Sequence, residues 1–195
     1  MATVETATKL TAEDLLRLPD GDQFELVNGE LVEIMMGAES SYVGGKLFVR
    51  LSNFTSEQNL GFMFGSDCGF QCFPDDPDKV RKPDVAFIRR GRLPGDVIPK
   101  GFVKIPPDLA AEVASPGDGM YEVSRKAEEY LAAGIPLVWI INPDNRTVLI
   151  YRADGSIVGL RENDELTGDT VLPGFRCLVG DLFPQRTPPH PDASR

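Results

Sequence analysis

Two acidic residues in apolar segments, with one lysine downstream, are the residue types that metal-dependent chemistry needs. Asp84 stands near the start of segment 83–88, and Glu112 lies within the apolar run 109–114. A carboxylate among apolar strand residues loses hydration, so it must find a cation or a hydrogen-bond donor, or take up a proton. With Lys126 on a predicted helix, two such carboxylates form the minimum set for holding a divalent metal ion and cleaving a phosphodiester.

Each of these residues also has a purely structural interpretation. Glu112 and Lys126 are consistent with a buried ion pair, which often adds little net stability. Asp84 follows a proline, where an acid is commonly a turn or capping residue, and Lys126 alone fits a solvated helix face. The three residues by themselves leave both interpretations open.

The rest of the sequence excludes several other classes of site. The single histidine, His190, lies in a proline-rich tail, so Ser-His or Cys-His nucleophilic catalysis has no imidazole in the core. The three cysteines lack a paired spacing, which makes a zinc site improbable on sequence grounds. Neither a phosphate-binding loop nor a dinucleotide-binding glycine motif occurs, so no small-molecule cofactor is evident.

The charge distribution is uneven. A formal net charge of -10 argues against a broad electrostatic surface for nucleic acid, because Lys and Arg supply most of the affinity for phosphates. Between Lys79 and Lys104, however, there are eight basic residues and only two acids. This basic segment brackets Asp84; a solvated loop with balancing charge is the alternative interpretation.

The hydrophobic pattern predicts one α/β (α+β) domain with a mixed sheet. Thr11 and Asp14 form a capping-box pattern for a short helix, and Asn28-Gly29 predicts a tight hairpin turn. The longer apolar stripes and runs predict two helices, at 40–56 and 120–133, and strands at 24–27, 30–35, 62–64, 68–73, 84–88, 109–114, 137–141, 147–151 and 156–160.

The predicted elements define the domain limits. We expect a disordered N-terminus over 1–10, one folded domain over 11–183 and a disordered proline-rich tail over 184–195. No apolar run approaches the length of a membrane span, and no secretory signal pattern is present at the N-terminus. The sequence therefore predicts a cytoplasmic protein.

Four parts of the sequence together resemble one known family. They are segment 24–31 (Phe-Glu-Leu-Val-Asn-Gly-Glu-Leu), segment 81–87 (Arg-Lys-Pro-Asp-Val-Ala-Phe), segment 107–116 (Pro-Asp-Leu-Ala-Ala-Glu-Val-Ala-Ser-Pro), and Lys126 followed by Tyr130, Gly134, Trp139 and Pro143. The chain resembles the bacterial Uma-type restriction endonuclease family of the PD-(D/E)XK nuclease superfamily over about 11–183. This resemblance implies a restriction-endonuclease-like core of a helix, a three-stranded meander, a helix and a strand, with an N-terminal hairpin and a C-terminal antiparallel extension.

The resemblance also implies roles for Asp84, Glu112 and Lys126. Asp84 matches the motif aspartate and Glu112 the second acid. Ala114 stands where the superfamily usually carries its lysine, and in this family that lysine is understood to have moved to the following helix, where Lys126 lies. Ser40 is a second departure, because many relatives carry a histidine at that position.

The expected function is a metal-dependent endonuclease that hydrolyses DNA phosphodiester bonds. Asp84 and Glu112 would bind Mg²⁺, or Mn²⁺ in its place, with help from the backbone carbonyl of Val113, while Lys126 would orient or deprotonate the attacking water. The residues expected to position the DNA backbone are Arg81, Lys82, Arg89 and Arg90.

Two alternatives and one assembly expectation accompany this function. An interaction module on the same fold that lost turnover would fit the acidic surface and Ser40, and a hydrolase of a smaller phosphate ester would use the same acids. A duplex break needs two sites related by a twofold axis, so we expect a homodimer that uses the N-terminal hairpin or the antiparallel edge 147–160.

Overall fold

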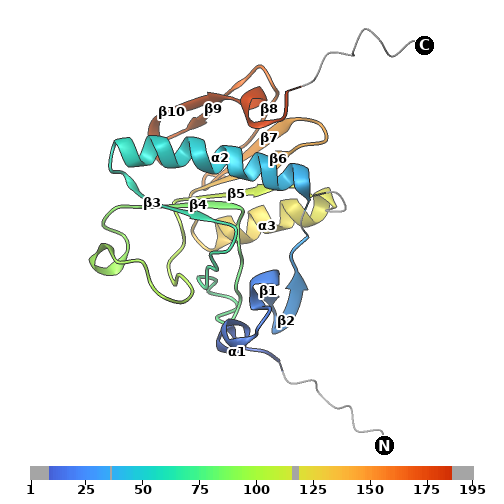
Figure 1. Ribbon diagram of the computed structural model, residues 1–195, viewed down its shortest axis with the longest axis vertical. Helices are drawn as coiled ribbons and strands as arrows, with labels where there is room; N and C mark the ends of the chain where they lie inside the picture. Colours follow the sequence, from blue (N-terminus) through green and yellow to red (C-terminus); the bar gives the residue numbers. More distant parts are fainter. Residues whose placement is uncertain (1–8, 36, 116–118, 186–195) are drawn as a thin grey trace, which may run out of the picture.

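The fold is built around a six-stranded mixed β-sheet, in a computed structural model that describes residues 9–35, 37–115 and 119–185. β5 and β6 run parallel on either side of a crossover through α3 (Met120–Ala132), and the other neighbouring pairs of this sheet are antiparallel. The predicted mixed sheet is therefore confirmed. Its strands lie in chain order (Figure 1): β3 (Gly61–Gly65), β4 (Val85–Arg89), β5 (Leu109–Val113), β6 (Leu137–Asn142), β7 (Thr147–Arg152) and β8 (Ile157–Leu160).

Two helices cover opposite faces of this sheet (Figure 1). The first, α2 (Ala38–Glu57), buries a stripe at four-residue spacing, and the second, α3, buries a shorter stripe on the other face. The stripe of α2 consists of Val43, Leu47 and Leu51, which pack in one cluster with Val85, Phe87 and Trp139. The stripe of α3 consists of Val123, Ala127 and Tyr130, which pack with Ala110, Val138 and Ile140.

The alternation of side chains along β5 decides where its acid lies. Leu109, Ala111 and Val113 belong to the cluster under α2, whereas Ala110 belongs to the cluster under α3. Because successive strand side chains point to opposite faces, Glu112 shares the α3 face with Ala110. The acid therefore faces the helix that carries Lys126.

The N-terminal part forms a separate two-stranded sheet. A short helix, α1 (Ala12–Arg17), and a 3-10 turn, Gly21–Gln23, precede β1 (Phe24–Val27) and β2 (Glu30–Glu33), which pair antiparallel. Asn28 and Gly29 have φ values of 54° and 79°, so the predicted tight turn is present. The predicted capping box of α1 is also present, formed by Thr11 and Asp14.

The ends of the described chain refine the expected domain limits. Leu10 donates its backbone N–H to the carbonyl of Gly29, so ordered structure begins before Thr11. The expected disorder of 1–8 and 186–195 concerns residues that lie outside the described part of the chain. Within that part, none of the helices has the length and apolarity required to span a membrane.

Two regions differ from the sequence-based expectations. Segment 68–73 is not a continuous strand, because Phe70 alone bridges to Arg81 on one side and to Val103 on the other. After β8, the chain forms a further hairpin of β9 (Glu165–Gly168) and β10 (Leu172–Leu178), which the sequence did not predict. Three of its residues, Leu166, Leu172 and Phe175, complete the cluster under α2.

Candidate active site

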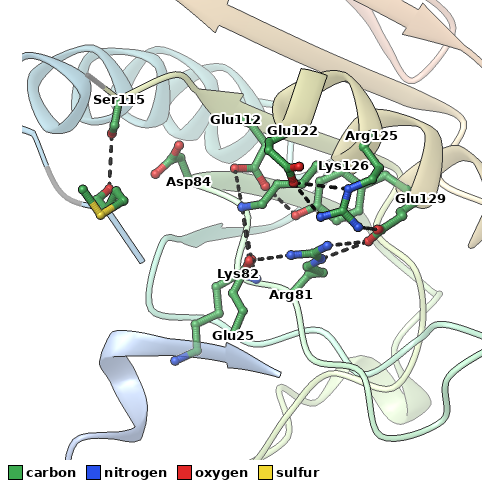
Figure 2. Close-up of polar contacts among 12 residues, drawn as sticks. Glu25, Arg81, Lys82, Asp84, Glu112, Ser115, Glu122, Arg125, Lys126 and Glu129 are labelled. Carbon is green, nitrogen blue, oxygen red and sulfur yellow. Dashed lines mark hydrogen bonds and ion pairs between the residues drawn. The ribbon is translucent and has the colours of Figure 1, made fainter. Parts of the chain in front are cut away.

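The strand pairing brings Asp84 and Glu112 to one place at the ends of β4 and β5. Val85 pairs with Ala111, so Asp84, one residue before β4, lies across from Glu112. The carboxylate of Asp84 accepts a hydrogen bond of 2.7 Å from the backbone N–H of Val113. This bond fixes Asp84 beside the carbonyl end of β5, where both acids lie near one another (Figure 2).

Lys126 reaches the same place from α3. Its Nζ atom lies 3.4 Å from Oε2 of Glu112 and 3.2 Å from Oε2 of Glu25. About a quarter of the Lys126 side chain is exposed, so the ammonium group borders solvent while it contacts two largely buried carboxylates. The three residues singled out in the sequence are therefore brought together.

The electrostatics of these groups follow from their burial. Burial raises the pKa of Glu112 to about 7, with contributions from the carboxylates of Asp84 and Glu25, while Lys126 and Tyr130 oppose the shift. Burial tends to lower the pKa of Lys126, but Glu112 and Glu25 outweigh it and raise that pKa above its usual range. Lys126 is consequently an ammonium ion at neutral pH.

Glu25 lies in segment 24–31, which carries part of the family resemblance, but it was not among the residues predicted for the site. It lies in β1, is 2% exposed, and contacts Arg81 as well as Lys126. Arg81 in turn contacts Glu129 of α3, so an unbroken line of ion pairs runs across the site (Figure 2). The signal that could have identified Glu25 is the one that identified Glu112, an acid within an apolar strand.

Tyr130 is a second residue whose polar role the sequence did not reveal. Its position on the apolar stripe of α3 predicted a core residue, and its ring is indeed buried. Its hydroxyl donates to Oε1 of Glu112, so that carboxylate has Tyr130 on one oxygen and Lys126 on the other. Glu112 is thus held between two side chains of the same helix.

The donor set fits a hard divalent cation that keeps several waters. Among residues 9–35, 37–115 and 119–185, no group of three or more His, Cys, Asp and Glu side chains is arranged to hold a metal ion. Two neighbouring carboxylates are nevertheless the usual protein contribution for Mg²⁺, which is bound by one or two carboxylates and retains water. A small hollow of about 40 Å³ lies beside Glu112, Val113 and Lys126, on the α3 side of Glu112, and Asp84 is not one of its lining residues.

The four basic residues expected at DNA are not brought together. Arg81 and Lys82 are only 1% and 6% exposed; Arg81 pairs with Glu25 and Glu129, while Nζ of Lys82 donates to the carbonyls of Gly21 and Asp22. Their burial contradicts the expectation that they contact phosphates, because their charged groups bind carboxylates and carbonyls inside the protein.

Arg89 and Arg90 are exposed, but they lie at the far end of β4 from Asp84. Arg89 is five positions after that acid, a distance on the order of 17 Å at about 3.3 Å per residue. Arg89 donates to the carbonyls of Thr170 and Val171, and Arg90 to the side chain of Asn59. They are therefore outside the carboxylate site itself.

Ser40, the position of the family departure, lies close to this site. Its hydroxyl is within 2.9 Å of the Ser115 hydroxyl and donates to the carbonyl of Gly37 at the start of α2. Ser115 lies two residues after Val113, the last residue of β5. The two hydroxyls therefore link α2 to the end of the strand that carries Glu112.

The arrangement of Asp84, Glu112 and a helix-borne Lys126 coincides with a family match over most of the chain. A model of the Uma2 family, described as "Putative restriction endonuclease", matches residues 12–180. The chain belongs to the Uma2 family. This match confirms the resemblance noted in the sequence, and it spans every strand of the central sheet.

A solved structure has the same fold. It is a "putative nuclease belonging to DUF820" from Anabaena variabilis, which superimposes with a TM-score of 0.75 and covers 89% of this chain and 97% of its own. The sequence identity is 20%, so the likeness concerns the fold of this Uma2 protein. No curated protein matches the sequence.

Proposed function

We propose that this Uma2 protein is a metal-dependent endonuclease that hydrolyses DNA phosphodiester bonds. The observation that carries the proposal is the meeting of Asp84, Glu112 and Lys126 at the ends of β4 and β5. Two neighbouring carboxylates and an ammonium group supply both signs of charge that phosphoryl transfer requires. The family is described as a restriction endonuclease and the solved structure of the same fold as a nuclease, and both descriptions support the same reaction class.

Asp84 and Glu112 would hold Mg²⁺ or Mn²⁺, together with the carbonyl of Val113 and waters. When bound, the ion would polarise the phosphate and lower the pKa of a bound water. Lys126 acts as a charged donor, because the two carboxylates keep it protonated; it orients the attacking water and stabilises the charge that builds on phosphorus.

Contact with the DNA backbone is assigned to exposed groups. Arg89 and Arg90 remain candidates for phosphates about 17 Å from the acids, whereas Arg81 and Lys82 act within the protein. A backbone contact at that distance positions the duplex without reading its sequence. No target sequence follows from it.

Plasmid cleavage tests the function. Supercoiled DNA incubated with the protein and Mg²⁺ or Mn²⁺ should be converted to nicked or linear forms, and chelation should stop the reaction. Asp84→Asn and Glu112→Gln should each abolish conversion, while Glu128→Gln, an exposed change on α3, should leave it intact. Metal-independent conversion, or equal activity of all three variants, would contradict the proposal.

The same preparation decides between the proposed nuclease and an interaction module on this fold. The net charge of -10 and Ser40 at the position where relatives carry histidine favour the module. Salt-dependent DNA binding without cleavage would identify it. Release of phosphate from a small ester, with neither DNA binding nor DNA cleavage, would instead identify a hydrolase of another phosphate ester.

A further inference from the structure

The carboxylate of Glu25 contacts three donors from two other parts of the chain, segment 81–82 and α3. Oε1 accepts the backbone N–H of Lys82 at 2.9 Å, and Oε2 accepts Nη1 of Arg81 at 2.8 Å. Nζ of Lys126 lies 3.4 Å from Oε1 and 3.2 Å from Oε2. Although burial alone would raise the pKa of Glu25, Lys126 and Arg81 lower it, so the group is a carboxylate in the folded protein.

Lys126 consequently lies between two carboxylates with different surroundings. Glu112 is the one assigned to the cation under the proposed function. Its oxygens contact Tyr130 and Lys126, whereas those of Glu25 contact Arg81, the backbone N–H of Lys82 and Lys126. A divalent cation at Glu112 repels the neighbouring ammonium, and the repulsion is strong where water is excluded. Something else must then keep Lys126 at the reacting centre.

We propose that Glu25 is a positioning residue that holds Lys126 in the site when Glu112 is engaged by a metal ion. This role rests on the proposed function, and it assigns to the N-terminal hairpin a part in the site on the central sheet. Glu25 acts through Lys126 and is not itself a ligand of the cation, since a metal would have to displace Arg81, a backbone N–H and Lys126 together.

The position of Glu25 is itself fixed by Arg81. The Arg81 side chain donates to Glu25 through Nη1 and to Glu129 through Nε and Nη2, at distances from 2.6 to 3.1 Å. Glu129 lies one helical turn after Lys126 on α3, where it also pairs with Arg125. The line Glu129, Arg81, Glu25, Lys126 therefore begins and ends on one helix, which restrains the ammonium group relative to its own backbone.

A double-mutant cycle on Mn²⁺ affinity tests this role without requiring turnover. Calorimetry would measure Mn²⁺ binding to the parent, Glu25→Gln, Lys126→Met and the double variant. In the parent background, Glu25→Gln should weaken Mn²⁺ binding by roughly tenfold or more. Lys126 would then contact Glu112 alone, and its ammonium group would compete with the cation for that carboxylate. In the Lys126→Met background, the same change should have less than about a threefold effect, because the ammonium is gone.

Two further variants serve as controls. Glu128→Gln removes an exposed charge from α3 outside the line Glu129, Arg81, Glu25 and Lys126, so its effect on Mn²⁺ binding should be small and equal in both backgrounds. Glu25→Asp keeps the charge beside Arg81 but shortens the reach to Lys126, and it replaces Glu25→Gln in the cycle if that variant does not fold. Circular dichroism and thermal unfolding would establish that each variant is folded.

Turnover on plasmid DNA then adds a second cycle. Glu25→Gln should lower kcat at saturating Mn²⁺ in the parent, with no added loss in Lys126→Met. A parent that binds Mn²⁺ but cleaves no DNA would refute the proposed function while the affinity cycle still decides the role of Glu25. Equal weakening of Mn²⁺ binding by Glu25→Gln in both backgrounds, or no Mn²⁺ binding by the parent, would overturn the positioning role.

Discussion

The Nζ atom of Lys126 lies 3.4 Å from Oε2 of Glu112, although one residue is on α3 and the other on β5. Ala114, two residues after Glu112, points to the same side of the chain, and it lines the small hollow together with Lys126. A small side chain at position 114 leaves space there for an ammonium group that the helix supplies.

Replacing Lys126 should remove catalysis while leaving the metal ligands in place. Lys126→Met should lower metal-dependent cleavage by about 10²–10³-fold, the usual loss when a donor that stabilises transition-state charge is removed. Single-turnover cleavage of plasmid DNA measures the effect.

The neighbouring position on the helix provides the control for this change. Arg125 pairs with Glu122 and Glu129 on the outer side of α3, so Arg125→Met should cleave at close to the parent rate. Equal cleavage by Lys126→Met and the parent would remove Lys126 from the mechanism.

Metal binding should depend on pH because Glu112 must be ionised. Burial and the nearby acids raise its pKa to about 7 from a usual 4.5, so Mn²⁺ affinity should increase as the pH rises from about 6 to 8 and then level off. Calorimetric titrations at several pH values measure this dependence, and an affinity that is constant over that interval would contradict it.

The stability of the metal-free protein should change in the opposite direction. The folded state holds the Glu112 proton more tightly than the unfolded chain, so this contribution is fully present below about pH 4.5 and is lost as the pH rises through about 7. Urea unfolding at pH 5 and pH 8 would show the loss, and Glu112→Gln should reduce it. An unchanged pH dependence in Glu112→Gln would assign the effect to other groups.

Arg81 should matter for folding more than for DNA affinity. Arg81→Met leaves Glu25 buried without its guanidinium, which should cost about 3–5 kcal/mol in the free energy of unfolding. Arg17→Met, which breaks an exposed pair with Glu13, should change that free energy by less than about 1 kcal/mol. If Arg81→Met instead retained stability and lost salt-dependent DNA binding, the original interpretation of Arg81 as a phosphate contact would be correct.

Assembly can be tested at the two surfaces considered for it. β8 is an edge strand with Ile157 and Val158 exposed, and β2 exposes Leu31 and Val32. We expect light scattering to give twice the monomer mass of 21.3 kDa. Ile157→Lys should restore the monomer if β8 pairs with its copy, and Val32→Lys should do so if β2 does. A mass near 21.3 kDa with and without DNA would exclude the dimer and leave nicking as the expected product.

The sequence predicted those parts of the fold whose signals are local. The turn at Asn28-Gly29 and the capping box of Thr11 and Asp14 depend on neighbouring residues alone. The β9–β10 hairpin was missed because its second strand is interrupted. Pro173 and Gly174 break the alternation of β10, and the pairing shifts register between Leu172 and Arg176.

The candidate site was predicted where an acid stood out against apolar neighbours, and it was missed where partners are distant in sequence. Glu25 and Lys126 are 101 positions apart in the sequence, and Arg81 and Glu25 are 56 positions apart. A basic residue in the sequence does not reveal whether an acid from another element will bury it. Arg81 and Lys82 were for that reason assigned to phosphates when they belong to the interior.

The most direct test of the central claim is the location of a bound metal ion. Crystals grown with Mn²⁺ should show an anomalous peak between Asp84 and Glu112, with carboxylate oxygens at about 2.0–2.6 Å and Nζ of Lys126 remaining against Glu25. Absence of a peak at saturating Mn²⁺, or a peak bound by other residues, would contradict the assignment of these two acids as the metal site.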